Sequence, residues 1–509
     1  MLRALAAPAQ ARRGRKSIFI IRDNAMPRLP ILLATLIGLS LPASASAEPP
    51  QAPQRQWLAG DHHVHSVYSA RYAVDPDHPD RAPTPIIGGD SSHSILMNAQ
   101  KARQFGLDWM VATDHGGPHH SALNHARAWP DVVAARRAVP DLTLFYGMEF
   151  DVPGGEHASL IMPYGPAERD QLRDIESRFA ERDAFPADPA RDRKPRMIEA
   201  LRYMNGLAEK PVLIGNHPSR TATGRGQWGL HSPTEYRLWH ETAPNVAIGM
   251  EGAPGHQAAR PKAYLDAAHG ARGLYGGYPT MGGFDQMVAT LGGAWDALLG
   301  QGLHWTITAS SDSHGHWTER GADFWPGEYA KTWVFAARDP ADILDGLRQG
   351  RVFVATGDLI DRLDVTVAPV ADPTRIAAIG DTLAVKKGTD IQVTIRFRPA
   401  SAPNGGGDTP VVNHVDLIVG AATGATDEHN PTTHLVRRFT ARDWRQDGDR
   451  IVIQHRMAAP EGAAYLRVRG ASTGEGEPSP DISGENPWRD LWFYANPVYI
   501  ATDADCAPE

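Results

Sequence analysis

Six short apolar runs in this chain each stop at a histidine or an acidic residue, and no other feature constrains the fold more. The clearest run, Trp305 to Ala309, ends on Ser310-Ser311-Asp312-Ser313-His314. The other runs end in the same way, on Asp61-His62-His63-Val64-His65, Thr113-Asp114-His115, Glu149, Asn216-His217 and Glu251. One polar strand end is explained by a helix cap or a turn. Six of them predict strands that carry ligands to a common site.

Helical patterns separate these runs. They cover residues 94–105, 122–139, 197–209 and 341–349, whereas the charged segment 168–196 is predicted to face solvent. Apolar strands that alternate with helices are typical of βα units around a parallel sheet. In a closed α/β barrel the loops after the strands converge on the axis and assemble the site there. The sequence therefore predicts an α/β fold with its site at the strand ends.

The first motif is a candidate metal clamp. Residues two apart in an extended chain project from one face, so Asp61, His63 and His65 point the same way. Two imidazoles on one face suit a divalent cation. Two ordinary surface histidines would give the same pattern, so the motif alone does not decide.

Cysteine content and charge limit the possible functions. Cys506 is the only cysteine among 509 residues, so neither a disulfide nor a thiolate metal cluster can form within one chain. Any metal must be held by imidazole and carboxylate, and the sequence holds 22 histidines. The formal net charge is −8 and no basic run follows the first 47 residues, which argues against nucleic acid as a partner.

Residues 1–47 have the features of a signal peptide region. An arginine precedes the apolar run Leu29 to Leu41, and small residues follow from Ala43 to Ala47. A membrane anchor is the alternative, but this run is too short to span a bilayer. Because the arginine-rich residues 1–25 precede an ordinary signal, Met26 is an alternative start of translation. We therefore expect a periplasmic or secreted protein without membrane insertion after signal removal.

The last third of the chain has a different pattern. From residue 360 the helical periodicity disappears, and short alternating or apolar runs recur between turn residues, including the Gly-rich loop 402–408. Short strands at such intervals predict an antiparallel β-sandwich. We therefore expect one domain over residues 55–358 and a β-sandwich domain over residues 360–505. The sandwich holds no clustered catalytic set, so we expect it to have a structural role or to shape substrate access.

Together the motifs identify a family resemblance. The chain resembles the PHP (polymerase and histidinol phosphatase) superfamily of metal-dependent phosphoesterases over residues 57 to about 356. The match is carried by Asp61-His62-His63-Val64-His65-Ser66, Thr113-Asp114-His115, Gly147-Met148-Glu149, Asn216-His217-Pro218 and Ser311-Asp312-Ser313-His314. The resemblance implies a distorted (β/α)7 TIM-like barrel that holds two or three divalent ions, of Mn, Fe or Zn.

The resemblance also implies which side chains bind these ions. Grouped by ion, they are His63, His65, Glu149 and Asp312 for the first, Glu149, His157 and His217 for the second, and His115 and His314 for the third. Glu156 is an alternative to His157. The sequence departs from the family pattern at Ser69-Ala70-Arg71, where many relatives have a third-ion ligand. His78, His93 or Asp75 would replace that ligand, or the site is dinuclear.

The chemistry of such a site is that of two-metal hydrolysis. A bridging carboxylate keeps two cations close together, and a water between them becomes a nucleophile near neutral pH. We expect Glu149, Asp312 and His314 to carry the catalytic role. Phosphate needs further cations at the rim, and Arg220, Arg225 and Lys331 are candidates, although each has the alternative of an ordinary solvated base. From their position after a strand, Glu251 and His256 are expected to line the substrate pocket.

Three functions fit the sequence. The first is a secreted metal-dependent phosphohydrolase that cleaves a small phosphomonoester or phosphodiester. The second is a metal-dependent hydrolase of an amide or ester bond, since two-metal barrels are reused across chemistries. The third is a non-catalytic, metal-stabilised binding module. The sequence leaves the oligomeric state, the native metal and the scissile bond open.

Overall fold

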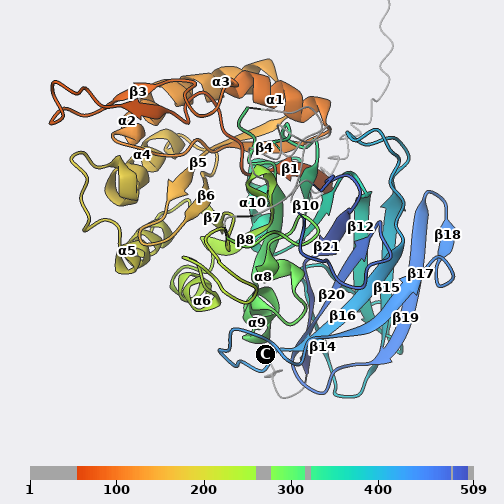
Figure 1. The fold of residues 1–509 in the computed structure, drawn as a ribbon. Coiled ribbons are helices and arrows are strands. Elements are labelled where there is room, and N and C mark those ends of the chain that lie inside the picture. The colour runs from red at the N-terminus through yellow and green to blue at the C-terminus, as the bar shows by residue number, and fades with distance from the viewer. Residues whose placement is uncertain (1–53, 259–274, 276, 316–322, 483–484, 503–509) are drawn as a thin grey trace, which may run out of the picture. The chain divides into compact units, whose positions relative to one another are not determined.

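A computed structural model of the chain describes residues 54–258, 275, 277–315, 323–482 and 485–502 (Figure 1). The predicted signal region 1–47 and Cys506 lie outside these residues. The described residues belong to one compact unit. None of the helices found among them has the length and apolar character that a membrane crossing requires.

Seven strands form the part of the large sheet that holds the strand-end motifs. In hydrogen-bonded order they are β1 (Gln56–Asp61), β4 (Trp109–Ala112), β5 (Thr143–Asp151), β6 (His157–Ile161), β7 (Val212–Gly215), β8 (Ala247–Pro254) and β9 (Thr306–Ser310). We expected a parallel sheet of βα units, and four of the six pairings are parallel. Strand β6 is antiparallel to both neighbours because the Pro153-Gly154-Gly155 turn joins it directly to β5.

The first and last strands of this series meet beyond their carboxyl ends. Val64 and Ser313 form a parallel bridge, and the amide of His65 donates to the carbonyl of Ser313 at 3.0 Å. Strand β10 (Ala330–Ala336) runs antiparallel to β1, and its Thr332 hydroxyl bonds both the amide and the carbonyl of Ala309 on β9. Side chains therefore connect β9 to β10, where no backbone ladder forms among the described strands.

Helices fill the connections between strands. They are α1 (Ile95–Gln104), α2 (His120–Leu123), α3 (Trp129–Ala138), α4 (Glu168–Phe179), α5 (Lys194–Asn205), α6 (Pro233–Thr242), α8 (Gln286–Ala289), α9 (Ala294–Gly300) and α10 (Pro340–Arg348). Short helical turns follow at η1 (Asn124–Ala128), η2 (Glu181–Asp183) and η3 (Gly255–Ala258). Ser94 caps α1 and Asp339 caps α10, as their short polar side chains predict.

The charged segment 168–196 is more structured than its composition suggests. We expected it to face solvent, but it contains α4, whose Leu172, Ile175 and Phe179 are buried. These positions recur every three to four residues, so they form one apolar face while the charged side chains cover the other. The expectation of a solvent-facing segment was therefore wrong for this face of the helix.

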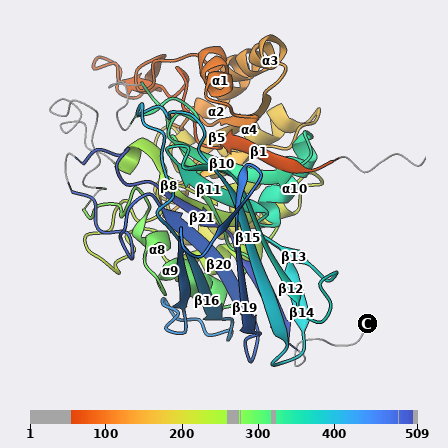
Figure 2. The same ribbon diagram turned by 90° about the vertical axis from the view of Figure 1, so that its right-hand side faces the viewer.

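The large sheet continues from the motif-bearing strands into the last third of the chain (Figure 2). Strand β11 (Val352–Thr356) pairs with β10 and also with β21 (Trp492–Ala495). Beyond β21 the sheet adds β20 (Ala464–Ala471), β16 (His414–Ala421), β17 (His434–Thr440), β22 (Val498–Thr502) and β14 (Thr382–Val385). The fold is therefore mixed α/β, with one large sheet that has parallel and antiparallel parts.

A second sheet of five strands lies in the same region. Its order is β13 (Ala377–Ala378), β12 (Ile360–Pro369), β15 (Asp390–Pro399), β19 (Arg450–Ala458) and β18 (Arg445–Asp447). The ring of Phe397 on β15 lies 6.2 Å from that of Phe493 on β21, so apolar side chains of the two sheets face each other. Since backbone hydrogen bonds join β11 to β21, the large sheet runs across the domain boundary predicted at residues 358–360. The two-domain division stays a prediction.

A buried ion pair also connects the two parts of the chain. Arg467 on β20 forms a two-pronged contact with Asp296 on α9, at 2.8 and 2.7 Å, and both side chains are almost fully buried. The Arg467 guanidinium lies over the ring of Trp295, 4.8 Å from its centre. A planar guanidinium suits both contacts, which a lysine ammonium could not make together.

Candidate metal centre

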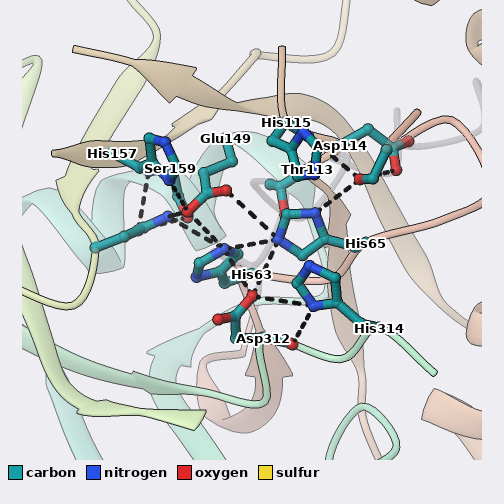
Figure 3. A network of polar contacts seen from close by, with 12 residues as sticks. His63, His65, Thr113, Asp114, His115, Glu149, His157, Ser159, Asp312 and His314 are labelled. Carbon is teal, nitrogen blue, oxygen red and sulfur yellow. Dashed lines mark hydrogen bonds and ion pairs between the residues drawn. The ribbon is translucent and has the colours of Figure 1, made fainter. Parts of the chain in front are cut away.

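Histidines and acids from the strand ends lie together in one buried cluster (Figure 3). It contains the eight predicted ligands, His63, His65, His115, Glu149, His157, His217, Asp312 and His314. Overlapping groups of three share members, and within each group the ligand atoms lie within 4.8 Å of one another. Several buried groups of His, Asp and Glu could therefore hold metal ions.

Glu149 lies at the centre of the cluster. Its Oε1 is 3.1 Å from Nε2 of His63, 2.9 Å from Nδ1 of His157 and 3.0 Å from Nε2 of His217. Its Oε2 is 3.6 Å from Nε2 of His65. One carboxylate that faces imidazoles on both sides is the arrangement by which a carboxylate bridges two cations.

Asp312 closes the other side of the cluster. Its Oδ1 lies 3.2 Å from Nε2 of His63, 3.0 Å from Nε2 of His65 and 3.5 Å from Nδ1 of His314, and its Oδ2 lies 3.3 Å from Nδ1 of His256. The backbone of Asp312 has φ of 49°, a region that non-glycine residues rarely adopt. Such strain persists only where the surroundings hold it, and here it directs the carboxylate at the histidines.

Asp90 is a member of the cluster that the sequence did not reveal. Its Oδ2 lies 2.8 Å from Nε2 of His115 and 3.5 Å from Nε2 of His314. We expected His78, His93 or Asp75 to replace the missing ligand at Ser69-Ala70-Arg71. His78 and Asp75 are exposed instead, and the ring of His93 packs on Trp325 at 4.3 Å. Asp90 thus completes the group formed by His65, His115 and His314.

The donor set fits cations. Among the described residues, both carboxylate oxygens of Asp312 and Nδ1 of His157 and of His217 are buried without a hydrogen bond of good geometry. In addition, Nε2 of His63 and Nε2 of His65 face each other at 3.0 Å. Two imidazole nitrogens and a carboxylate that converge in this way could share a cation, and imidazole and carboxylate ligands suit Mn, Fe or Zn.

Hydrogen bonds to Nδ1 orient the imidazole rings of His63 and His65. Nδ1 of His63 lies 2.7 Å from Oε1 of Glu251, and Nδ1 of His65 lies 2.8 Å from the hydroxyl of Ser69. Both contacts leave Nε2 to face the cluster. Ser69 in turn donates to Asp114, which also accepts from the amide and hydroxyl of Ser66. Such partners fix the tautomer and the ring direction of a metal-binding histidine.

Burial and neighbouring charge set the protonation of the cluster. Burial opposes ionisation of Glu149, but His157 and His63 outweigh it and hold the pKa of Glu149 well below its usual range. Burial also opposes ionisation of Glu251, but the neighbouring His63 outweighs it and lowers the pKa of Glu251 to about 2. Burial and Arg220 lower the pKa of His217 to about 4. Glu149 and Glu251 are thus ionised and His217 is neutral at pH 7, and the ionised carboxylate of Glu149 and the neutral imidazole of His217 are the forms that bind metal.

Two arginines lie at the rim of the cluster. Arg182 pairs with buried Asp151, and its Nη2 is 3.4 Å from Nε2 of His157. Arg220, one of the predicted phosphate contacts, pairs with buried Glu156. Arg182 was not among the predicted phosphate contacts, because it lies in a charged segment with many similar side chains.

The other four predicted substrate contacts lie in different surroundings. They are Glu251, His256, Lys331 and Arg225. Glu251 is fully buried and lies behind His63, where it accepts from His63, the amide of His217 and the hydroxyl of Ser310, so it does not line a substrate surface. His256 lies inside the cluster, beside Asp312. Lys331 pairs with Asp358, and Arg225 is exposed and contacts no acid among the described residues. Neither base is brought to the cluster.

Comparisons with known proteins give only distant similarity. No protein-family model matches the chain, and no curated protein matches it. Among solved structures, an Endonuclease Q in complex with a 27-mer duplex substrate that has an abasic lesion at the active site is similar, with 12% sequence identity and a TM-score of 0.29. The match covers 58% of this chain and 56% of that chain, so the protein spans little more than half the length of the endonuclease.

A second solved structure is similar over a shorter part of the chain. It is a chitin binding domain from Burkholderia pseudomallei, with 10% identity and a TM-score of 0.13, and the match covers 24% of this chain and 57% of that domain. With TM-scores this low, neither structure assigns a family or a reaction to the protein.

Proposed function

We propose that the protein is a metal-dependent phosphoesterase of the PHP type that hydrolyses a small phosphorylated substrate. The observation that carries the proposal is the position of Glu149, whose Oε1 lies near His63, His157 and His217 and whose Oε2 lies near His65. That arrangement, together with the strand-end motifs in their order along the chain, supports a site with at least two ions.

The residues of the cluster would divide the work as follows. His63, His65, Glu149 and Asp312 would hold one ion, Glu149, His157 and His217 a second, and Asp90, His115 and His314 a third. When bound, such ions supply a nucleophilic water at neutral pH and neutralise negative charge on a phosphoryl group. Glu251 and Ser69 keep the imidazoles of His63 and His65 in the tautomer that presents Nε2 to the cluster.

The rim supports a phosphate rather than a neutral substrate. Arg182 and Arg220 are held in place by the buried carboxylates of Asp151 and Glu156, on the side of the cluster where His157 lies. Their side chains are 43% and 26% exposed, so each guanidinium keeps contact with solvent beside the ions. Fixed guanidiniums beside an ion site are suited to phosphoryl oxygens, whose negative charge they stabilise.

The test is hydrolysis by the purified, metal-loaded protein. We expect release of nitrophenol from nitrophenyl phosphate monoesters or diesters in the presence of Mn, Zn or Fe. Asp312→Ala is expected to abolish turnover while the circular dichroism spectrum stays that of the wild type. Two or more bound ions without activity on any phosphoester would contradict the proposal, and would favour hydrolysis of an amide or ester, or a binding module.

Asp90 provides a second, sharper variant. Asp90→Asn should lower the content of bound metal and the turnover, because its carboxylate faces His115 and His314. Asp75→Asn is the matched control, since Asp75 is an exposed acid of the same connecting segment and its carboxylate accepts from the backbone amide of Asp77 at 3.0 Å. Equal metal content in both variants would remove Asp90 from the site.

We also propose that the mature protein is exported, with its signal in residues 1–47. The apolar run and the small residues after it support this proposal. Sequencing of the amino terminus of the exported protein tests it, and a terminus before Ala43 would contradict it.

A further inference from the structure

A hollow of about 520 Å³ lies beside the metal centre and is not used by the ions. Its apolar walls are formed by Pro83, Pro118, Ala184, Phe185, Ala187 and Pro189. Pro83 belongs to the loop of the hairpin formed by β2 (Arg71–Ala73) and β3 (Thr84–Ile86), and the last four belong to the segment after η2. A concave, mainly apolar surface of this size is typical of a site for a small molecule.

Two of the wall residues connect the hollow to the cluster. Arg182 forms part of the wall, and its guanidinium lies 3.4 Å from Nε2 of His157. Pro118 forms another part, and it follows His115 by three residues. The inner wall therefore includes Arg182, which contacts a ligand of the second ion, and Pro118, whose chain segment carries a ligand of the third. A substrate with its phosphoryl group at the ions would extend past Arg182 into the hollow.

The charges of the hollow restrict what the rest of the substrate can be. Besides Arg182, which is paired with Asp151, the charged side chains of the wall are the acids Glu181, Asp188 and Asp192. Asp188 accepts from the amide of Ala190 at 2.9 Å, and Asp192 accepts from the amide of Gly154 at 2.8 Å. Acids that are held in place by backbone amides repel a second anionic group. The acids thus disfavour a second anionic group, and the apolar residues of the wall favour an apolar one.

We propose that this hollow binds the apolar, aromatic alcohol part of a phosphate monoester whose phosphoryl group lies at the metal centre. The proposal rests on the phosphoesterase function proposed above and names its substrate class. The ring of Phe185 and the apolar pyrrolidine rings of three prolines provide surfaces on which an aromatic group packs. Substrates that carry further phosphates or carboxylates would be poor ligands.

The experiment measures binding rather than turnover. The Mn-loaded protein is titrated in a calorimeter with 1-naphthylmethylphosphonate and with methylphosphonate, which have the same head group and cannot be hydrolysed as esters. We expect the naphthyl compound to bind at least about tenfold more tightly, because its ring is buried in the hollow. In Ala187→Trp, which fills the hollow, this preference should fall below about threefold while the affinity for methylphosphonate stays unchanged.

Ala190→Trp is the matched control. Ala190 lies three residues further along the same segment, is exposed and is not part of the wall, so this variant should keep the preference of the wild type. Equal binding of both phosphonates to the wild type, or an unchanged preference in Ala187→Trp, would overturn the proposal and leave the phosphoesterase function standing. If neither phosphonate binds and nitrophenyl phosphate is not cleaved, both proposals fall.

Discussion

Glu251→Gln is the most informative single change in this protein, because it alters one charge and almost no volume. The carboxylate of Glu251 is fully buried and accepts from His63 Nδ1 at 2.7 Å, from the amide of His217 at 2.6 Å and from the hydroxyl of Ser310 at 2.7 Å. A glutamine side chain has one oxygen and one NH2 group in the same space, so it cannot accept from all of these donors.

Both orientations of the glutamine amide damage the centre. If the NH2 group faces His217, two donors oppose each other and a buried N–H is left without an acceptor. If it faces His63, then Nδ1 must accept, and the ring proton moves to Nε2, which lies 3.1 Å from Glu149 and 3.2 Å from Asp312. A protonated Nε2 cannot bind a metal. One hydrogen bond to a charged group contributes about 1.5–3 kcal/mol, which corresponds to about 10- to 150-fold weaker metal binding.

The assay is calorimetric titration of the metal-free variant with Mn²⁺, with the wild type alongside. Ser310→Ala is the control, since it removes one donor to Glu251 and leaves the carboxylate in place, and its affinity should fall only about threefold. Near-UV circular dichroism shows whether the core is intact. If Glu251→Gln binds Mn²⁺ as tightly as the wild type, Glu251 does not orient His63, and the assignment is wrong.

Three further predictions concern stability. EDTA is expected to lower the Tm of the metal-loaded protein, since ions at 100 times their Kd stabilise the folded state by about 2.7 kcal/mol; an unchanged Tm would contradict a metal centre. Asp296→Asn leaves the buried Arg467 without its ionised partner and should cost about 3–5 kcal/mol in urea unfolding, where a loss below 1 kcal/mol would contradict the buried pair. Both ring nitrogens of buried His120 face acceptors, Glu176 and the Tyr68 carbonyl, and although burial opposes it, Glu176 raises the pKa of His120 to about 9. The contribution of protonated His120 to the free energy of unfolding should be complete below about pH 6.5 and lost as pH rises through 9. The difference in the free energy of unfolding between the wild type and His120→Gln, measured by urea unfolding, should therefore shrink between pH 6 and pH 10.

The position of most candidate ligands could be predicted because a strand end is a local feature. The runs before Asp61, His115 and Asp312 are apolar and short, and each stops at a polar residue. Strands of one curved sheet bring such ends together whatever the loops do between them. The mixed α/β character of the fold follows from the same alternation of short apolar runs and helices.

Asp90 could not be predicted from the same kind of evidence. It follows Gly88 and Gly89, a context typical of a turn, and it precedes His115 by 25 residues. Its position depends on the next two residues, because the hydroxyl of Ser91 and the amide of Ser92 both bond the carbonyl of His314. That contact is between segments far apart in the chain, and no local pattern encodes it.

The role of Glu251 and the direction of β6 were also beyond local pattern. An acid after an apolar run is compatible with a pocket surface or with a buried partner of another side chain, and only the position of His63 decides between them. Residues 157–161 have the composition of any buried strand, and this composition does not show whether the strand runs parallel or antiparallel to its neighbours. The continuity of the large sheet through β11 and β21 likewise depends on a pairing between residues about 140 apart.

The pairing of β11 with β21 sets a time constraint on biosynthesis. Asn496, just after β21, donates to the carbonyls of Ile307 and Val352 and accepts from the amide of Ile307, so it occupies the seam between β9 and β11. None of these bonds can form until residue 496 has left the ribosome. Until then β11 is an open edge strand with apolar side chains, which is a site for pairing between nascent chains. Export in an unfolded state, or a chaperone that covers this edge, would prevent such pairing between nascent chains.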